Sequence, residues 1–292
     1  MKAMSSSGPW RIVSLLAICT PLASCSATRM AYDNADTALR FMVSGYVDLD
    51  AAQTEELKLR IARFHRWHRV NELPLYAALM RSASQRAALG ITAEDVGWGL
   101  ANVRARYRRL GAKAAEEVAP VLATLAPDQV AGIERKFAAN NQKFAGEFLV
   151  SDDAKRRRAQ LKRMLERFRD FAGDLTPEQE ARIERFALAH EKHVAVRFED
   201  RKRWQRDFVA ALKQQHDAQE LGRNLSEMFS KPELRRSEEF IREDRRWDED
   251  LGELIVDLDR SLSQKQRAHV VRRLSDYAND FAILAGEKKE AA

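Results

Sequence analysis

Apolar residues recur at helical spacing along nearly the whole chain beyond its first 28 residues. Val130, Ile133, Phe137, Phe144 and Phe148 follow steps of 3, 4, 7 and 4 residues, which places them on one face of a helix. A second set with helical periodicity is Leu161, Met164, Leu165, Phe168 and Phe171. No alternation typical of strands and bounded by hairpin turns is present. The pattern predicts an all-α protein, an elongated bundle of long amphipathic helices whose apolar faces form the core.

Helix boundaries follow from this periodicity and from proline and glycine. We expect a break near Pro74 in the second helix and another near His193 in the sixth. We interpret glycines 90, 111, 173 and 222 as breaks between helices. The predicted helices are 28–44, 51–88, 92–118, 127–149, 152–172, 176–215, 217–229, 232–259 and 263–284.

Four helix starts share one five-residue pattern, Leu-x-x-x-Gln. The copies are Leu49–Gln53, Leu125–Gln129, Leu175–Gln179 and Leu262–Gln266, with Ile91–Asp95 as a looser fifth. In the third copy Thr176 can cap the helix, Pro177 suits the first turn, and Gln179 can complete a capping box. Intervals of 42, 34, 50 and 87 residues are too uneven for a solenoid. We interpret the pentads as helix-entry signals. Their Leu-Thr-x-x-Gln form also resembles the signature of the Spy-type periplasmic chaperones, which are small, helical and cradle-shaped.

The first 25 residues predict secretion and a lipid anchor. Lys2 and Arg11 precede an apolar run over residues 12–22 that is shorter than the roughly 20 residues of a membrane-spanning helix. Leu22-Ala23-Ser24-Cys25 then resembles the bacterial lipobox. We therefore expect residues 1–24 to be a lipoprotein signal peptide, cleaved between Ser24 and Cys25. Acyl chains of the palmitate type on Cys25 would anchor a helical periplasmic domain over residues 25–292.

The residues around Cys25 refine this prediction. Ser26 replaces the aspartate that retains many lipoproteins at the inner membrane, so we expect attachment to the outer membrane, facing the periplasm. Cys19 lies inside the apolar run and is read as an ordinary signal residue. The alternative is a buried N-terminal helix with a free cysteine. After cleavage and acylation no thiol is left for a disulfide, so stability must come from helix packing.

The charge balance argues against nucleic acid as a partner. Removing Lys2 and Arg11 from the 50 basic residues leaves 48 against 44 acidic ones, a net charge of +4. Basic clusters at residues 104–109, 155–158 and 201–203 lie among acidic residues, which is typical of solvated helix faces with ion pairs one turn apart. The expected partners are the membrane, through the N-terminal lipid, and other envelope proteins.

A family resemblance covers most of the proposed mature chain. The runs that carry it are Ala31–Asp36, Tyr46-Val47-Asp48-Leu49, Trp67-His68-Arg69 and Glu72-Leu73-Pro74-Leu75-Tyr76-Ala77, with the pentad Leu175–Gln179. They resemble a family of uncharacterised proteobacterial helical lipoproteins classified as a domain of unknown function. The resemblance implies a helical architecture and a location in the cell envelope, and it supplies no catalytic residue.

Candidate chemistry is sparse. His65 with His68, and His190 with His193, are spaced so that each pair could supply two metal ligands. Neither pair stands in a His-Glu-x-x-His pattern and a third ligand is not identifiable, so we read them as surface or capping histidines. We predict no metal, no cofactor and no catalytic residue, since nucleophile elbows and phosphate-binding glycine loops are absent from the sequence.

The leading functional hypothesis is a non-enzymatic envelope lipoprotein that binds other proteins, in a chaperone-like or scaffolding role. It requires an apolar concave face rimmed by Arg and Lys. The alternative is an envelope enzyme acting on peptidoglycan or lipid, which requires a cleft holding a carboxylate of raised pKa.

Overall fold

The computed structural model describes residues 29–150, 152–214 and 217–286. The predicted signal peptide, Ser24 and Cys25 lie outside these ranges. Within them the chain is helical and contains no strand, which confirms the predicted all-α class. The elements are α2 (Ala35–Ser44), α3 (Ala51–Asn71), α4 (Leu73–Leu89), α5 (Ala93–Leu122), α6 (Pro127–Phe148), α7 (Asp153–Ala172), α8 (Pro177–Ala189), α9 (His193–Gln214), α10 (Ala218–Ser230), the 3-10 helix η2 (Pro232–Arg235), α11 (Glu238–Arg260) and α12 (Gln264–Ala285).

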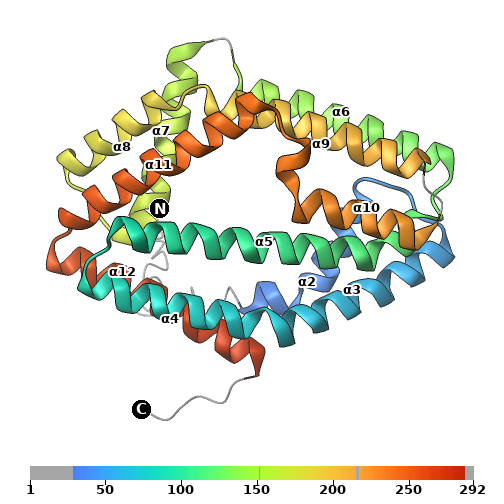
Figure 1. Ribbon diagram of the computed structural model, residues 1–292, viewed down its shortest axis with the longest axis horizontal. Coiled ribbons are helices and arrows are strands. Elements are labelled where there is room, and N and C mark those ends of the chain that lie inside the picture. Colours follow the sequence, from blue (N-terminus) through green and yellow to red (C-terminus); the bar gives the residue numbers. More distant parts are fainter. Residues whose placement is uncertain (1–28, 151, 215–216, 287–292) are drawn as a thin grey trace, which may run out of the picture.

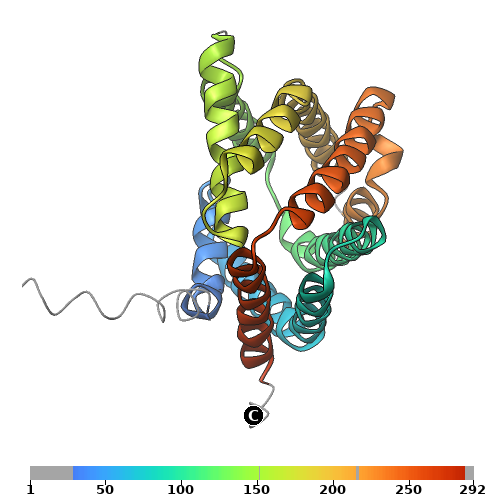
Figure 2. The same ribbon diagram turned by 90° about the vertical axis from the view of Figure 1, so that its left-hand side faces the viewer.

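The long helices run roughly along the long axis of an elongated molecule (Figure 1). Helix α5 lies in the middle and packs against α10 and α3, while α12 packs along α4 and α6 along α9. Figure 2 places α4 and α12 next to each other at the lower side and α7 rising above α2. None of the helices in the described ranges is both long enough and apolar enough to span a bilayer.

The chain divides into two successive halves, α2–α6 and α7–α12, and the contacts between helices follow the same order in both. In the first half α2 packs on α3, and in the second α7 packs on α8. The closing helix of each half packs on the other half, since α6 contacts α9 and α12 contacts α4. Each half also contains one helix broken near its middle, namely α3 with α4 and α8 with α9. The two halves are therefore interlocked through α6 and α12.

The buried apolar residues form a main core and two smaller clusters. The main core surrounds the crossing of α5 and α10, with Leu221, Leu225 and Met228 almost fully buried. A second cluster joins Ile183 and Phe186 of α8 to Leu254 and Leu258 of α11, beneath the apolar face of α7. The third joins Leu57 and Ile61 to Val121.

Most predicted boundaries are confirmed to within a few residues. The expected breaks occur at Glu72 and between Ala189 and His193. Capping boxes form at Asp50, Thr92, Thr176 and Ser263. Ala126 has no side-chain oxygen, so only the reverse bond forms there, from its N–H to Gln129 Oε1 at 2.8 Å. The predicted helix 232–259 is divided, because η2 ends before Ser237 caps α11.

Two of the four glycines that were predicted to separate helices lie inside helices instead. Gly90 and Gly173 end helices at φ values of 104° and 76°, as expected. Gly111 and Gly222 instead lie inside α5 and α10, so that prediction was wrong for them. A Cβ on Gly111 would lie 2.5 to 2.8 Å from Phe229. These glycines allow the two helices to approach closely, which a single sequence cannot distinguish from a helix end.

We expect Gly111→Ala to lower the free energy of unfolding by about 1–2 kcal/mol, because overpacking outweighs the better helix propensity of alanine. Urea denaturation followed by circular dichroism measures the change. Gly97→Ala in the same helix is the matched control, since no atom lies within 4 Å of its added Cβ. That variant should gain about 0.5–1 kcal/mol. Equal effects at both positions would contradict the close approach of α5 and α10.

Candidate binding groove

A groove of about 670 Å³ lies between helices of both halves, and we refer to it as the central groove. Its wall is mainly apolar and comes mostly from α4, α5, α7, α11 and α12. Helices α8 and α9 contribute Gln179 and Arg197, and the turns between helices contribute Leu175, Leu262 and Ile91. The apolar residues that line it are Ala83, Ala87, Ile91, Val96, Leu100, Met164, Phe168, Phe171, Ala172, Leu175, Trp247, Leu251, Ile255, Leu258, Leu262, Val270 and Leu274. A cavity of this size and lining is typical of ligand sites.

The glutamines of the four pentads pair at the two ends of the molecule, and we call each pair an amide clamp. In the first clamp Gln129 Nε2 donates to Gln53 Oε1 at 2.7 Å, and Gln53 Nε2 donates back at 3.2 Å. In the second, Gln266 Nε2 donates to Gln179 Oε1 at 2.8 Å and Gln179 Nε2 donates back at 3.2 Å. Figure 1 places the starts of α3 and α6 at the opposite end from those of α8 and α12.

Each clamp amide uses all of its hydrogen-bonding capacity. Gln179 Oε1 also accepts from the N–H of Thr176, and its Nε2 also donates to the carbonyl of Ser261. Gln266 makes the equivalent bonds to Ser263 N–H and the carbonyl of Asp174. The first clamp repeats this arrangement with the carbonyls of Thr124 and Asp48. The pentads therefore do more than start helices, because they join the starts of distant helices in pairs.

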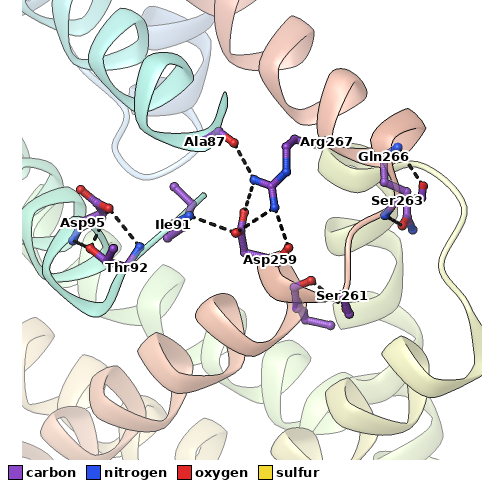
Figure 3. Close-up of polar contacts among 10 residues, drawn as sticks. Ala87, Ile91, Thr92, Asp95, Asp259, Ser261, Ser263, Gln266 and Arg267 are labelled. Carbon is purple, nitrogen blue, oxygen red and sulfur yellow. Dashed lines mark hydrogen bonds and ion pairs between the residues drawn. The ribbon is translucent and has the colours of Figure 1, made fainter. Parts of the chain in front are cut away.

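A charged cluster lies beside the groove, next to the second clamp (Figure 3). Arg267 binds Asp259 through two parallel contacts of 3.0 Å, and Asp259 Oδ2 also accepts the N–H of Ile91 at 3.0 Å. Arg267 donates further to the carbonyl of Ala87 at 2.7 Å. The cluster ties the turn between α4 and α5 to the turn between α11 and α12.

Asp95, the other carboxylate of the groove, is also fully engaged. Its Oδ2 accepts from both the hydroxyl and the N–H of Thr92, and Arg86 binds its other oxygen. The hydrogen bonds from Thr92 and Arg86 lower the pKa of Asp95 to about 2. Both groove carboxylates are therefore occupied by internal hydrogen bonds and ion pairs.

Two arginines at the groove have no such engagement. Arg167 on α7 and Arg197 on α9 both line it, and both are exposed. Across the part of the chain that the structure describes, neither arginine has a carboxylate within ion-pair distance. Arg197 lies near enough to Asp200 to lower the pKa of that carboxyl, but it is Arg236 that approaches Asp200 to 3.6 Å. The groove thus combines an apolar wall with two arginines that form no ion pair in the described part of the chain.

A second cavity of about 480 Å³ shares Arg197 with the central groove, and we call it the aromatic cavity. Its wall includes Phe198, Trp204 and Phe240, together with four arginines and two aspartates. Burial raises the pKa of the Asp200 carboxyl, against the effect of nearby arginines. His193 closes one side of the cavity, stacked on Trp247 with a ring-centroid distance of 4.0 Å.

The four candidate histidines serve as packing groups, and within the described ranges no group of three His, Cys, Asp or Glu side chains could hold a metal ion. His65 contacts Asp36 at 2.7 Å, and His68 contacts the Tyr32 hydroxyl at 2.9 Å. His190 contacts Asp250 at 2.9 Å. His190 is the buried C-cap of α8, in agreement with the capping alternative. His193 is buried at the start of α9, so a surface position was wrong for it.

The buried histidines predict a loss of stability in mild acid. Burial lowers the pKa of His193 and of His68 to about 4. The unfolded chain, with pKa values near 6.5, binds more protons below that pH, so the free energy of unfolding falls as the pH drops from about 6.5 towards 4. His193→Phe should flatten this slope in urea denaturation at several pH values, while His269→Gln on the partly exposed side of α12 should keep it. An unchanged slope in His193→Phe would contradict the assignment.

The motif residues behind the family resemblance form the joint between α3 and α4. Glu72 and Leu73 are fully buried, and Arg109 of α5 lies 2.8 Å from the Glu72 carboxylate. Tyr76 packs edge-on against His68, with ring centroids 5.4 Å apart. The basic clusters also hold helices together, as in the ion pairs of Arg104 with Asp248 and of Arg157 with Glu191.

The comparisons with known proteins give one match. A family of unknown function (DUF6279) matches residues 45–242, which is more than half of the chain. The match includes the runs from Tyr46, Trp67 and Glu72, whereas Ala31–Asp36 precedes it. No curated protein and no solved structure matches the chain. The matched residues include the joint at Glu72, the first amide clamp and Gln179 of the second clamp. The chain therefore belongs to this family of unknown function (DUF6279).

Proposed function

We propose that this chain is a non-enzymatic binding protein of the cell envelope, anchored by lipid on Cys25, which shields apolar parts of other envelope proteins in the central groove. The observation that carries the proposal is the groove itself, an apolar concave wall with Arg167 and Arg197 at its edge. Contiguous apolar surface that folding leaves open is typical of an interaction site.

The polar groups of the groove support binding rather than chemistry. Asp95 and Asp259 are held in ion pairs with Arg86 and Arg267, and Gln179 is held in the second clamp. General acid catalysis at neutral pH needs a carboxyl group whose pKa is raised, and a pKa of about 2 at Asp95 is the reverse. The predicted secretion signal and the resemblance of the Leu-Thr-x-x-Gln form to the Spy-type chaperones support an envelope role of the chaperone type.

Suppression of aggregation tests the proposal. The purified full chain is added to a denatured, aggregation-prone test protein, and light scattering is followed over time. We expect slower aggregation with the unaltered chain and loss of this effect in Leu100→Glu, which places a charge in the groove. Leu89→Glu is the matched control, because Leu89 is 91% exposed and outside the groove. Equal activity of the two variants would refute the groove as the binding surface.

The anchor needs a separate measurement, since Ser24 and Cys25 lie outside the described residues. Mass spectrometry of the protein extracted from its native membrane should show Cys25 as an acylated N-terminus. Retention of Met1 with an unmodified Cys25 would refute the envelope address.

One observation favours the alternative, an envelope enzyme acting on peptidoglycan or lipid. Asp200 lines the aromatic cavity and has a raised pKa because of burial. An enzyme that uses this carboxyl would lose hydrolysis of isolated peptidoglycan or phospholipid in Asp200→Asn while its fold, measured by circular dichroism, is kept. Absence of hydrolysis by the unaltered chain would exclude this function for these substrates.

A further inference from the structure

The groove wall offers a polypeptide backbone few hydrogen-bonding partners. Asp95, Asp259 and Gln179 already have internal partners, which leaves the two arginines and the indole N–H of Trp247. An extended peptide carries one N–H and one C=O per residue, and each of these groups costs free energy if it is buried without a partner. An extended stretch of a client protein would therefore lose backbone hydrogen bonds to water on entering and regain few of them, a cost that a hydrocarbon chain does not have. A flexible hydrocarbon chain has no backbone polar groups and can follow an irregular apolar wall.

The two arginines without an ion pair indicate which chemical group lies at the end of the bound hydrocarbon chain. Arg167 and Arg197 come from two different helices, α7 and α9, and both line the groove without a bound carboxylate. Arg197 also lines the aromatic cavity, so the two spaces adjoin at this side chain. Guanidinium groups bind carboxylate and phosphate oxygens through paired hydrogen bonds.

We infer that the central groove binds a fatty acyl chain, with an anionic group at the head of that chain against Arg167 and Arg197. The inference rests on the proposed function, because it takes the groove as the binding site, and it specifies the apolar part that the groove accepts. The acyl chain can come from a free lipid or from the acylated terminus of a partner protein.

Binding of a fluorescent fatty acid tests the inference. The full chain with Cys25→Ala is used, so that its own acyl chains do not compete. A series of fatty acids of decreasing length then displaces the probe, and each two methylene groups removed should weaken binding about tenfold. The uncharged methyl ester of the same acid should bind more weakly than the acid. Affinity that is independent of chain length would overturn the acyl assignment.

Paired arginine variants test the head group. In Arg167→Ala with Arg197→Ala, the acid and its methyl ester should bind equally. The matched control is Arg158→Ala with Arg206→Ala, which removes two exposed arginines from the same helices outside the groove and should keep the preference for the acid. A preference for the acid that survives in the groove variant would overturn the role of the two arginines.

The source of the chain is decided by a peptide pair, a short acidic peptide with and without an N-terminal palmitoyl group. Tighter binding of the acylated peptide than of free palmitate assigns the chain to a lipid-bearing protein, and the reverse order assigns it to a free lipid. Equal binding of the two peptides would overturn the inference in favour of unmodified polypeptide. A chain that slows aggregation but binds no fatty acid retains the proposed function and loses this inference, whereas failure in both assays removes both.

Discussion

Replacing Arg267 by alanine is expected to lower the free energy of unfolding by about 3 kcal/mol, because it leaves a nearly buried carboxylate without its counter-ion. The Asp259 side chain is 9% exposed and would keep only the N–H of Ile91 as a partner. The carbonyl of Ala87 would lose its donor as well. Urea denaturation monitored by circular dichroism gives the change in free energy.

Two further variants separate this effect from a general loss of charge. Arg260→Ala removes an exposed arginine at the end of α11 and should change stability by less than about 1 kcal/mol. Combining Asp259→Leu with Arg267→Met removes both charges and should recover part of the loss, since a buried ion pair stabilises little compared with apolar groups of similar volume. A double variant as unstable as Arg267→Ala would show that packing, and not the unpaired charge, governs this cluster.

Gln179→Ala is expected to lower the free energy of unfolding by about 2–3 kcal/mol, through buried groups left without partners. Gln179 is 1% exposed, and its loss deprives the N–H of Thr176, the carbonyl of Ser261 and the amide of Gln266 of bonds. The same denaturation experiment measures the change.

A double-mutant cycle shows whether the two amides act as a unit. Gln179→Ala combined with Gln266→Ala should cost less than the sum of the single changes, with a coupling of about 1 kcal/mol. Gln264→Ala, an exposed glutamine two residues from Gln266, should change stability by less than about 0.5 kcal/mol. Strict additivity across the cycle would contradict the reciprocal hydrogen bonds of the clamp.

Local signals in the sequence predict most of the fold. Periodicity located the long helices, and the pentads located four helix starts because capping involves residues only three positions apart. The glycines show the limit of such signals. Gly90 adopts a positive φ at a helix end, whereas Gly111 lies inside a helix and allows close contact with Phe229. In the sequence, both are single glycines next to helical periodicity, so the two roles cannot be told apart.

The groove could not be predicted, because its parts are distant in the sequence. Asp259 meets Ile91 across 168 positions, and Arg267 meets Ala87 across 180. Arg167 and Arg197 stand among many other arginines, and only the fold shows that these two lack carboxylate partners while facing an apolar wall. The pentads did contain a signal that sequence reasoning left unused, since four glutamines at equivalent positions can satisfy one another in pairs.

The last helix of each half packs on the other half, and this packing limits which shortened fragments can keep the native contacts. The family match ends at residue 242, inside α11 (Glu238–Arg260). A fragment with that boundary would keep Gln179 but lose Gln266, Asp259 and Arg267, and it would uncover the face of α4 on which α12 lies. The region that sequence comparison delimits therefore omits contacts that hold both halves together, and a fragment that keeps α12 on α4 must extend through Ala285.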